Sequence, residues 1–111
     1  MRKLPVALIV LAALLVAAAP AAAKTRNVKI GDDFFVRNSG VATVSVKKGT
    51  TVKWNWRGSD QHNVVVQKGP RKFQSALKTK GSFKRKLTRR GTYKIICSIH
   101  APDMRMTLKV T

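Results

Sequence analysis

Apolar residues recur at every second position through most of this 111-residue chain, and clusters of Gly, Pro, Asn and Asp interrupt them at short intervals. Period two is the period of a β-strand, because successive side chains point to opposite faces of a sheet. The clearest case is residues 51–57, where Val52, Trp54 and Trp56 would share one face and enter a core. Many short strands separated by turn residues predict an all-β fold, either a sandwich or a barrel.

The same alternation marks the expected strands. They fall at residues 26–30, 43–47, 51–57, 62–67, 82–87, 92–96 and 104–110. Phe34 and Phe35 are expected to fill the core between the first two strands. Residues 71–81 lack a clean period and are expected to form a long connection with a short helical turn. Arg85 falls on the inward face of its strand, which predicts an edge position where its stem covers apolar surface and its head reaches water.

Residues 1–23 have the composition of a secretory signal peptide. Two basic residues give a positive start, residues 4–16 form an apolar run, and Ala21–Ala23 provides small residues for cleavage. An uncleaved membrane anchor is the alternative, since the apolar stretch is long enough to reach across a bilayer core of about 30 Å. No cysteine lies near the cut, so a lipid-anchored form is not expected. Residues 24–111 are then long enough for one small domain.

Basic residues far outnumber acidic ones. The chain has 23 Lys and Arg against four acidic residues, all of them Asp. Without the two basic residues of the signal, the charge is about +17. Such a field steers the protein toward an acidic redox partner or an anionic surface, and peripheral contact with a membrane of anionic lipid fits it as well. The basic residues are densest from Lys78 to Arg90, which is either a docking patch or a solvated face.

The signal also predicts where the protein works. An exported protein would lie in the periplasm, in the cell envelope or outside the cell. Nucleic acid would satisfy the positive charge, but an exported protein is not expected to meet it. In such oxidising compartments a single unpaired thiol needs an explanation, because it is exposed to oxidation and pairing. Cys97 is the only cysteine, so the chain has no internal disulfide.

Cys97 has two interpretations. It is either a buried, inert side chain or a metal ligand. The second interpretation draws support from His62 and His100, the only histidines, and from Met104. A thiolate and two imidazoles in a trigonal plane, with a long, weak axial thioether, form the ligand set of a mononuclear blue-copper site.

The spacing of these residues favours the metal site. Cys97 ends a strand, two residues turn the chain so that His100 points back, and the loop returns Met104 as the next strand begins. His62 arrives from a different strand, which would place the copper between two sheets. Taken singly, each has an ordinary role, His62 as a satisfied polar residue and Met104 as core packing. Met106 is the rival axial ligand, but strand alternation directs it into the core.

Several short motifs extend this pattern along the chain. They run from Val52 and Trp54 through His62-Asn63-Val64, Phe73, Phe83 and Gly91-Thr92-Tyr93 to Cys97-Ser98-Ile99-His100 and Met104. With these motifs, the chain from about Val28 to its C-terminus resembles the cupredoxins of the plastocyanin and pseudoazurin type. The resemblance implies a Greek-key β-sandwich that binds one type 1 copper and shuttles single electrons between larger partners. It also implies that Asn63 holds the ligand loop and offers its backbone N–H to the Cys97 sulfur.

The resulting hypothesis is a monomeric electron carrier and not an enzyme. Copper oxidases and copper nitrite reductases need further histidines for additional copper centres, and both histidines are already used. An exported copper storage or delivery protein is the alternative, with the same ligands and an exchangeable metal. A metal-free basic domain that coats anionic surfaces is another, and it would tolerate the loss of Cys97. In the carrier, electrons would pass through the His100 edge, inside an apolar patch of Ile99, Ala101 and Pro102.

Overall fold

Residues 24–111 are the part of the chain that the computed structural model describes, so the predicted signal, residues 1–23, lies outside it. This part contains eight β-strands. They are β1 (Thr25–Gly31), β2 (Phe34–Phe35), β3 (Ala42–Val46), β4 (Thr51–Trp56), β5 (Val65–Lys68), β6 (Ser82–Lys86), β7 (Gly91–Ile96) and β8 (Arg105–Val110). Among these residues there is no helix with the length and apolar character needed to cross a membrane.

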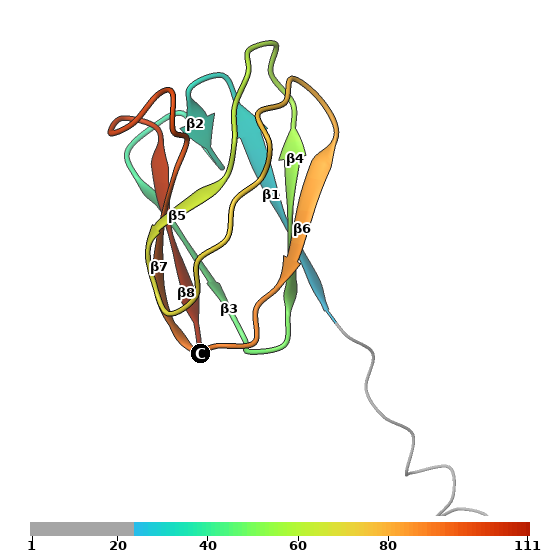
Figure 1. Ribbon diagram of the computed structural model, residues 1–111, viewed down its shortest axis with the longest axis vertical. Coiled ribbons are helices and arrows are strands. Elements are labelled where there is room, and N and C mark those ends of the chain that lie inside the picture. The colour runs from blue at the N-terminus through green and yellow to red at the C-terminus, as the bar shows by residue number, and fades with distance from the viewer. Residues whose placement is uncertain (1–23) are drawn as a thin grey trace, which may run out of the picture.

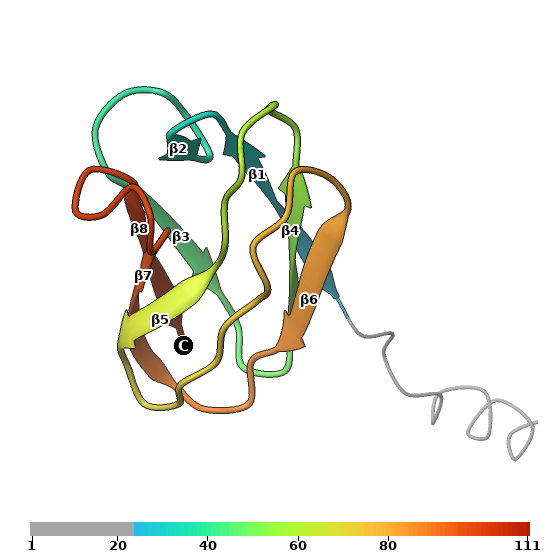
Figure 2. The same ribbon diagram turned by 45° about the horizontal axis from the view of Figure 1, so that its top comes forward.

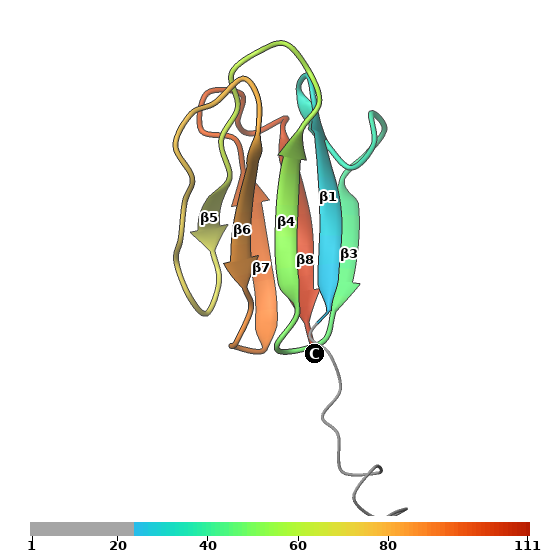
Figure 3. The same cartoon turned by 90° about the vertical axis from the view of Figure 1, so that its right-hand side faces the viewer.

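The strands form two four-stranded sheets that face each other (Figure 1, Figure 3). One sheet has the order β2-β1-β4-β6 and the other the order β3-β8-β7-β5. Two pairs are parallel, β1 with β4 and β3 with β8, and the chain changes sheet at every connection from β3 to β7. Parallel neighbours require long crossovers, so segments far apart in the sequence lie side by side. The predicted all-β sandwich is confirmed.

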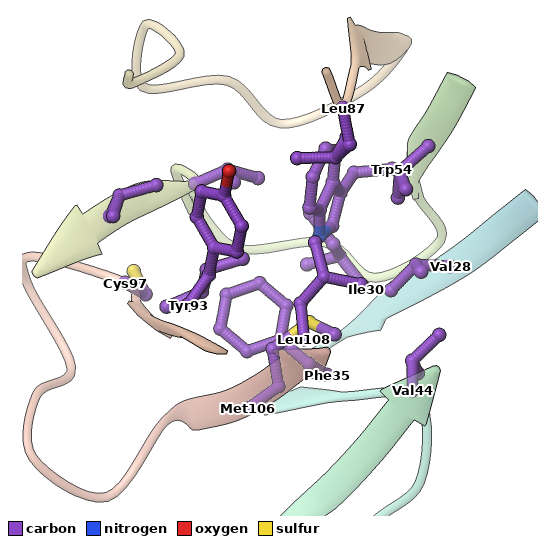
Figure 4. Close-up of a cluster of buried hydrophobic side chains, with 14 of the residues drawn as sticks. Val28, Ile30, Phe35, Val44, Trp54, Leu87, Tyr93, Cys97, Met106 and Leu108 are labelled. Atoms are coloured by element: carbon purple, nitrogen blue, oxygen red, sulfur yellow. The ribbon is translucent and has the colours of Figure 1, made fainter. Parts of the chain in front are cut away.

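Alternate side chains of the strands point between the sheets and form the core. In β4, Val52, Trp54 and Trp56 are buried and their neighbours are half-buried, as the alternation predicts. Figure 4 shows side chains from both sheets in one cluster, among them Trp54 from β4 and Tyr93 from β7. Full burial of one large apolar side chain stabilises a fold by about 1.5–3 kcal/mol. Packing between the sheets therefore holds the strands in place, and with them the ends of the loops that connect the strands.

The sheet edge at β6 has the character predicted for Arg85. Its side chain is exposed, and its guanidinium carbon lies 5.3 Å from the ring centres of both Phe73 and Phe83. The long side chain thus covers two aromatic rings while its charge stays in water. Together with its two basic neighbours it forms an exposed surface that we call the β6 basic face. This face consists of Lys84, Arg85 and Lys86.

Three local predictions are wrong in detail. The strand expected at residues 62–67 starts only at Val65, and residues 71–81 contain no helical turn. Residues 73–78 run antiparallel beside residues 62–66 and share backbone hydrogen bonds with them, but the pairing is limited to isolated bridges at His62–Lys78 and Val65–Gln74, so no continuous strand forms before Val65. These bonds hold both segments extended and occupy the groups that a helical turn would use. The third difference is Phe34, which is half-buried while Phe35 is buried, since the two side chains of β2 point to opposite faces.

The connections at one end of the sandwich belong to β1–β2, β4–β5 and β7–β8 (Figure 1, Figure 2). The opposite end holds the turn between β3 and β4 and both ends of the described chain. There the Thr51 N–H donates to Lys24 O at 2.9 Å, and the Lys48 N–H donates to Thr111 O at 2.8 Å. The residues with metal-binding chemistry all lie at the first end, which we call the site end.

Candidate metal centre

The loop from Cys97 to Met104 closes on itself through its backbone. Cys97 directly follows β7, and its N–H donates to Met104 O at 3.1 Å. The His100 N–H donates to Cys97 O at 3.3 Å, and the Met104 N–H donates to His100 O at 3.2 Å. The predicted return of the chain between these three residues is therefore present, and the backbone hydrogen bonds fix their relative positions.

His62 reaches the same place from the β4–β5 connection and is held by its own backbone. Its N–H donates to Lys78 O at 2.9 Å, and its carbonyl accepts from the Lys78 N–H at 3.0 Å. The same carbonyl accepts from the indole Nε1–H of Trp56, also at 3.0 Å. Since Trp56 belongs to the core, the rigid sheet positions His62 directly. His62 thus belongs to a bridged, extended segment just before β5 and not to the strand itself.

The side chains of His62, Cys97 and His100 converge. The two Nδ1 atoms lie 3.2 Å apart, and the Cys97 Sγ lies 3.5 Å from the Nδ1 of His100 and 4.0 Å from the Nδ1 of His62. All three donor atoms lie within 4.8 Å of one another. Two imidazole nitrogens and one thiol sulfur turned toward a common point are a donor set that copper prefers. The residues present therefore fit a copper ion.

Burial separates the two histidines. The side chain of His62 is 0% exposed, whereas that of His100 is 30% exposed. Cys97 is fully buried. A metal held by these residues would be shielded from water on the sandwich side, with the His100 ring as its edge toward solvent.

The two candidate axial methionines have different surroundings. Met104 is fully buried, is hydrogen-bonded through its backbone to Cys97 and His100, and borders a hollow beside the His100 ring. Met106 lies inside β8, where it is opposite Ala42 of β3 and Ile95 of β7. Figure 4 shows its side chain in the apolar cluster. The expectation that Met106 is a packing residue agrees with this position.

Asn63 ties the His62 segment to the cysteine loop. Its Nδ2 donates to Ser98 Oγ at 2.9 Å, and its Oδ1 accepts from the Ser98 N–H at 2.8 Å. The side chain therefore holds the ligand loop, as the resemblance implies. Among the described residues, the polar contacts of the Cys97 sulfur are with the Nδ1 atoms of His62 and His100. The backbone N–H of Asn63, expected as a donor to the sulfur, is not one of them.

Two aspartates that sequence reasoning missed lie against the outer nitrogens of the histidines. Asp32 and Asp33 form the turn between β1 and β2, with Oδ1 of Asp32 at 3.1 Å from His62 Nε2 and Oδ1 of Asp33 at 3.3 Å from His100 Nε2. Backbone hydrogen bonds from Asp60 and Ser59 and the contact with His62 lower the pKa of Asp32 from 3.8 to about 2. The rarity of acidic residues in this chain was the one available signal.

The surface around His100 is apolar with charged neighbours. Ile99 is 51% exposed, and Ala101 and Pro102 are exposed beside it, as the sequence predicts for a patch around the histidine edge. Asp33 and Asp103 border the same hollow. The site end therefore combines an apolar rim with carboxylates, while the β6 basic face lies on the edge of one sheet.

A two-sheet β-sandwich with a His-Cys-His cluster between the loops at one end defines the cupredoxin class of copper proteins. Residues 25–111 match the sequence model of the copper binding proteins of the plastocyanin/azurin family, and the chain belongs to that family. A comparison with curated protein sequences gave no match.

Solved structures show the same fold. A Cu(I) amicyanin variant aligns with a TM-score of 0.66 and 25% identity, covering 78% of this chain and 82% of the amicyanin. A purple cupredoxin from Nitrosopumilus maritimus aligns with a TM-score of 0.64 and 23% identity, covering 78% of this chain and 99% of the purple cupredoxin. The copper-containing nitrite reductase of Thermus scotoductus SA-01 aligns with a TM-score of 0.67 and 23% identity over 86% of this chain. This chain spans only 26% of that nitrite reductase.

Proposed function

We propose that this protein is a type 1 copper electron carrier in which His62, Cys97, His100 and Met104 bind one copper ion. The convergence of two Nδ1 atoms and one sulfur at a buried point is the observation that carries the proposal. Copper bound there supplies a one-electron Cu(I)/Cu(II) couple. The backbone hydrogen bonds of the Cys97–Met104 loop and the Asn63 bridge keep the donor atoms in place, so little rearrangement is required between oxidation states.

Electron exchange would use the His100 edge. His62 and Cys97 are buried, and His100 is the one member of the cluster with a partly exposed ring. The exposed Ile99, Ala101 and Pro102 offer an apolar contact area around that ring. A partner that covers this area would exclude water from the shortest path to the metal site.

Copper storage or delivery is less well supported by these features. Delivery requires that the ligands be reached and released one after another by an acceptor. Here His62 is fully buried and is fixed by Trp56, Lys78 and Asp32. A site with this much support favours retention of the metal over exchange.

Catalysis at a second copper centre is not part of the proposal. The copper nitrite reductase among the similar structures is about four times as long as the aligned region, and its activity does not transfer to this chain. The sequence has two histidines and one cysteine, and all three side chains belong to one cluster. A further imidazole-based centre has no residues left to build it.

The proposal for the partner and the location follows from charge and from the N-terminal segment. Residues 24–111 are proposed as an exported copper-binding domain after removal of residues 1–23. With a charge of about +17, this monomeric domain would attract an acidic redox protein or an anionic surface in the cell envelope. Contact would then be completed by the apolar rim at the site end.

The test of the function is the colour and copper content of the purified protein. One copper per chain and an intense thiolate-to-copper charge-transfer band are expected on adding Cu(II) to the metal-free protein. Cys97→Ala should abolish the band and His62→Ala should weaken or abolish it. Gln61→Ala, an exposed neighbour of His62, is the matched control and should leave the band unchanged. A Cys97→Ala protein that remains blue would refute the ligand assignment.

A further inference from the structure

The turn between β1 and β2 places one carboxylate on each candidate copper-binding histidine. Asp32 Oδ1 lies 3.1 Å from the Nε2 of His62, and Asp33 Oδ1 lies 3.3 Å from the Nε2 of His100. Asp33 adopts a φ of 70°, a left-handed conformation that Asp tolerates better than most residues. Two adjacent side chains thereby reach two different rings.

Asp32 is held firmly from its other side. Both of its carboxylate oxygens accept from the Ser59 N–H, at 2.9 and 3.0 Å, and Oδ1 also accepts from the Asp60 N–H at 2.9 Å. Gly58 makes this approach possible, since a Cβ at that position would overlap the Asp32 carboxylate. The carboxylate is thus fixed by two backbone donors before it meets His62.

This arrangement determines which nitrogen of His62 carries the proton. An ionised carboxylate only accepts hydrogen bonds, so the Nε2 of His62 must be the donor. Nδ1 is then left with a free lone pair, and it is the atom that faces the Cys97 sulfur and the His100 Nδ1. Asp33 and His100 make a contact of opposite charge without a hydrogen bond, and the Asp33 carboxylate is 66% exposed, so the tautomer argument is confined to His62.

We propose that the Asp32–Asp33 turn is a positioning device for the copper site, in which Asp32 fixes the His62 imidazole in the tautomer that presents Nδ1 to the metal and both carboxylates lower the reduction potential by stabilising Cu(II). This inference rests on the proposed function. Carboxylates that accept from the outer nitrogen of a ligating histidine fix its orientation and raise its basicity. Both residues act through the histidines.

The positive charge of the whole protein acts on the copper site in the opposite direction to the two carboxylates. A net charge of about +17 disfavours additional positive charge, and therefore favours Cu(I) over Cu(II). The chain has only four acidic residues, and Asp32 and Asp33 are two of them. Their negative charges lie next to the ligand rings and offset the surrounding basic residues where the copper would change its charge.

The first test uses the metal-free protein and needs no copper. Proton–nitrogen correlation spectra at pH 8 report the tautomer of each histidine ring, and the chain has only two. We expect the Nε2–H form for His62. In Asp32→Asn the amide oxygen can stay at the Oδ1 position and accept from Ser59, Asp60 and His62, so the Nε2–H form should persist. Asp32→Ala removes this acceptor, so the Nδ1–H form of His62 should appear. A His62 that carries its proton on Nδ1 in the unmodified protein would overturn the inference.

The second test uses the copper protein. Asp32→Asn should reduce Cu(II) affinity by about 10–100-fold. If the loss falls on Cu(II) alone, each factor of ten raises the potential by about 59 mV for a one-electron couple. Asp33→Asn should give a smaller rise, since its carboxylate is exposed. Asp103→Asn is the control for charge alone, because it removes the same charge beside His100, and it should change Cu(II) affinity less than twofold.

The outcomes separate the two proposals. An Asp32→Asn protein whose potential and affinity match those of Asp103→Asn would refute the positioning role, even with a blue site. A protein that shows the expected His62 tautomer but forms no blue copper site would refute the proposed function and leave the tautomer assignment standing. Should Asp32→Asn fail to fold, Asp33→Asn on the exposed turn provides the comparison of potentials at His100, where an unchanged potential would refute the role of Asp33.

Discussion

Exchanging each of the two neighbouring methionines for leucine distinguishes a copper ligand from a core residue. Met104 and Met106 are both buried, at 0% and 1% exposed, and the two substitutions change the same atoms. Only Met104 is joined through its backbone to Cys97 and His100, while Met106 packs between β3 and β7. The expected result is a raised reduction potential in Met104→Leu and an unchanged potential in Met106→Leu.

The size of each effect follows from burial. A volume-conserving exchange in a core costs less than about 1.5 kcal/mol of unfolding free energy. For residues 24–111, an unfolding entropy of about 2.1 cal/mol/K per residue makes this a Tm decrease of less than about 8 °C in either metal-free variant. Loss of a weak axial donor that favours Cu(II) tenfold would raise the potential of Met104→Leu by about 59 mV.

The assay combines thermal melts of the metal-free proteins with redox titrations followed at the charge-transfer band. Similar melts with different potentials would assign the axial position to Met104. A potential that moves in Met106→Leu and not in Met104→Leu would transfer that role to Met106. If neither exchange moves the potential, a thioether has no part in the site and the four-ligand assignment is refuted.

Two further predictions concern the fold and the partner. Burial raises the pKa of Tyr93, the only tyrosine, from 10.0, so stability present below pH 10 should be lost as the pH rises further, because the unfolded chain ionises first. Phenolate absorbance should show that Tyr93 ionises at a higher pH in the folded protein than in the unfolded chain. Tyr93→Phe loses the 2.7 Å hydrogen bond to Arg89 O and should be about 1 kcal/mol less stable at neutral pH. This variant should not show the loss of stability above pH 10. Replacing the β6 basic face by glutamines should flatten the salt dependence of electron transfer to an acidic partner, since steering is screened over roughly 10 Å at 0.1 M salt. Stopped-flow rates at several ionic strengths measure it, and a salt-independent rate in the unmodified protein would contradict the steering argument.

The sequence predicts those parts of the structure that depend on local periodicity. Val52, Trp54 and Trp56 are buried because period two fixes which side of a strand they occupy. The meeting of Cys97 and His100 follows from their short separation. The convergence of His62 with them was also expected, because the only two histidines and the only cysteine of the chain together suit one metal site. Ligation itself remains a prediction.

The missed features depend on pairing between distant segments. Asp32 meets Ser59 and His62 because β1 lies parallel to β4, with Ile30 opposite Trp56, and nothing in the local sequence specifies that register. Residues 71–81 were expected to contain a helical turn because they lack a clean period. What holds them extended is backbone hydrogen bonding to residues 62–66, a pairing between separate segments that the sequence of either one does not specify. Single-segment patterns cannot reveal such mutual support.

The ends of the described chain have a practical consequence for experiments on surfaces. Lys24 and Thr111 are hydrogen-bonded beside the β3–β4 turn, while the β7–β8 connection, which carries His100, lies at the site end (Figure 1). A linker attached after Thr111 would bind the molecule to a gold or carbon electrode with the His100 ring directed toward the solution. Direct current to the electrode would then be weak, and a soluble redox mediator would restore it. An immobilised layer of this protein should therefore favour exchange with dissolved partners over exchange with the electrode beneath it.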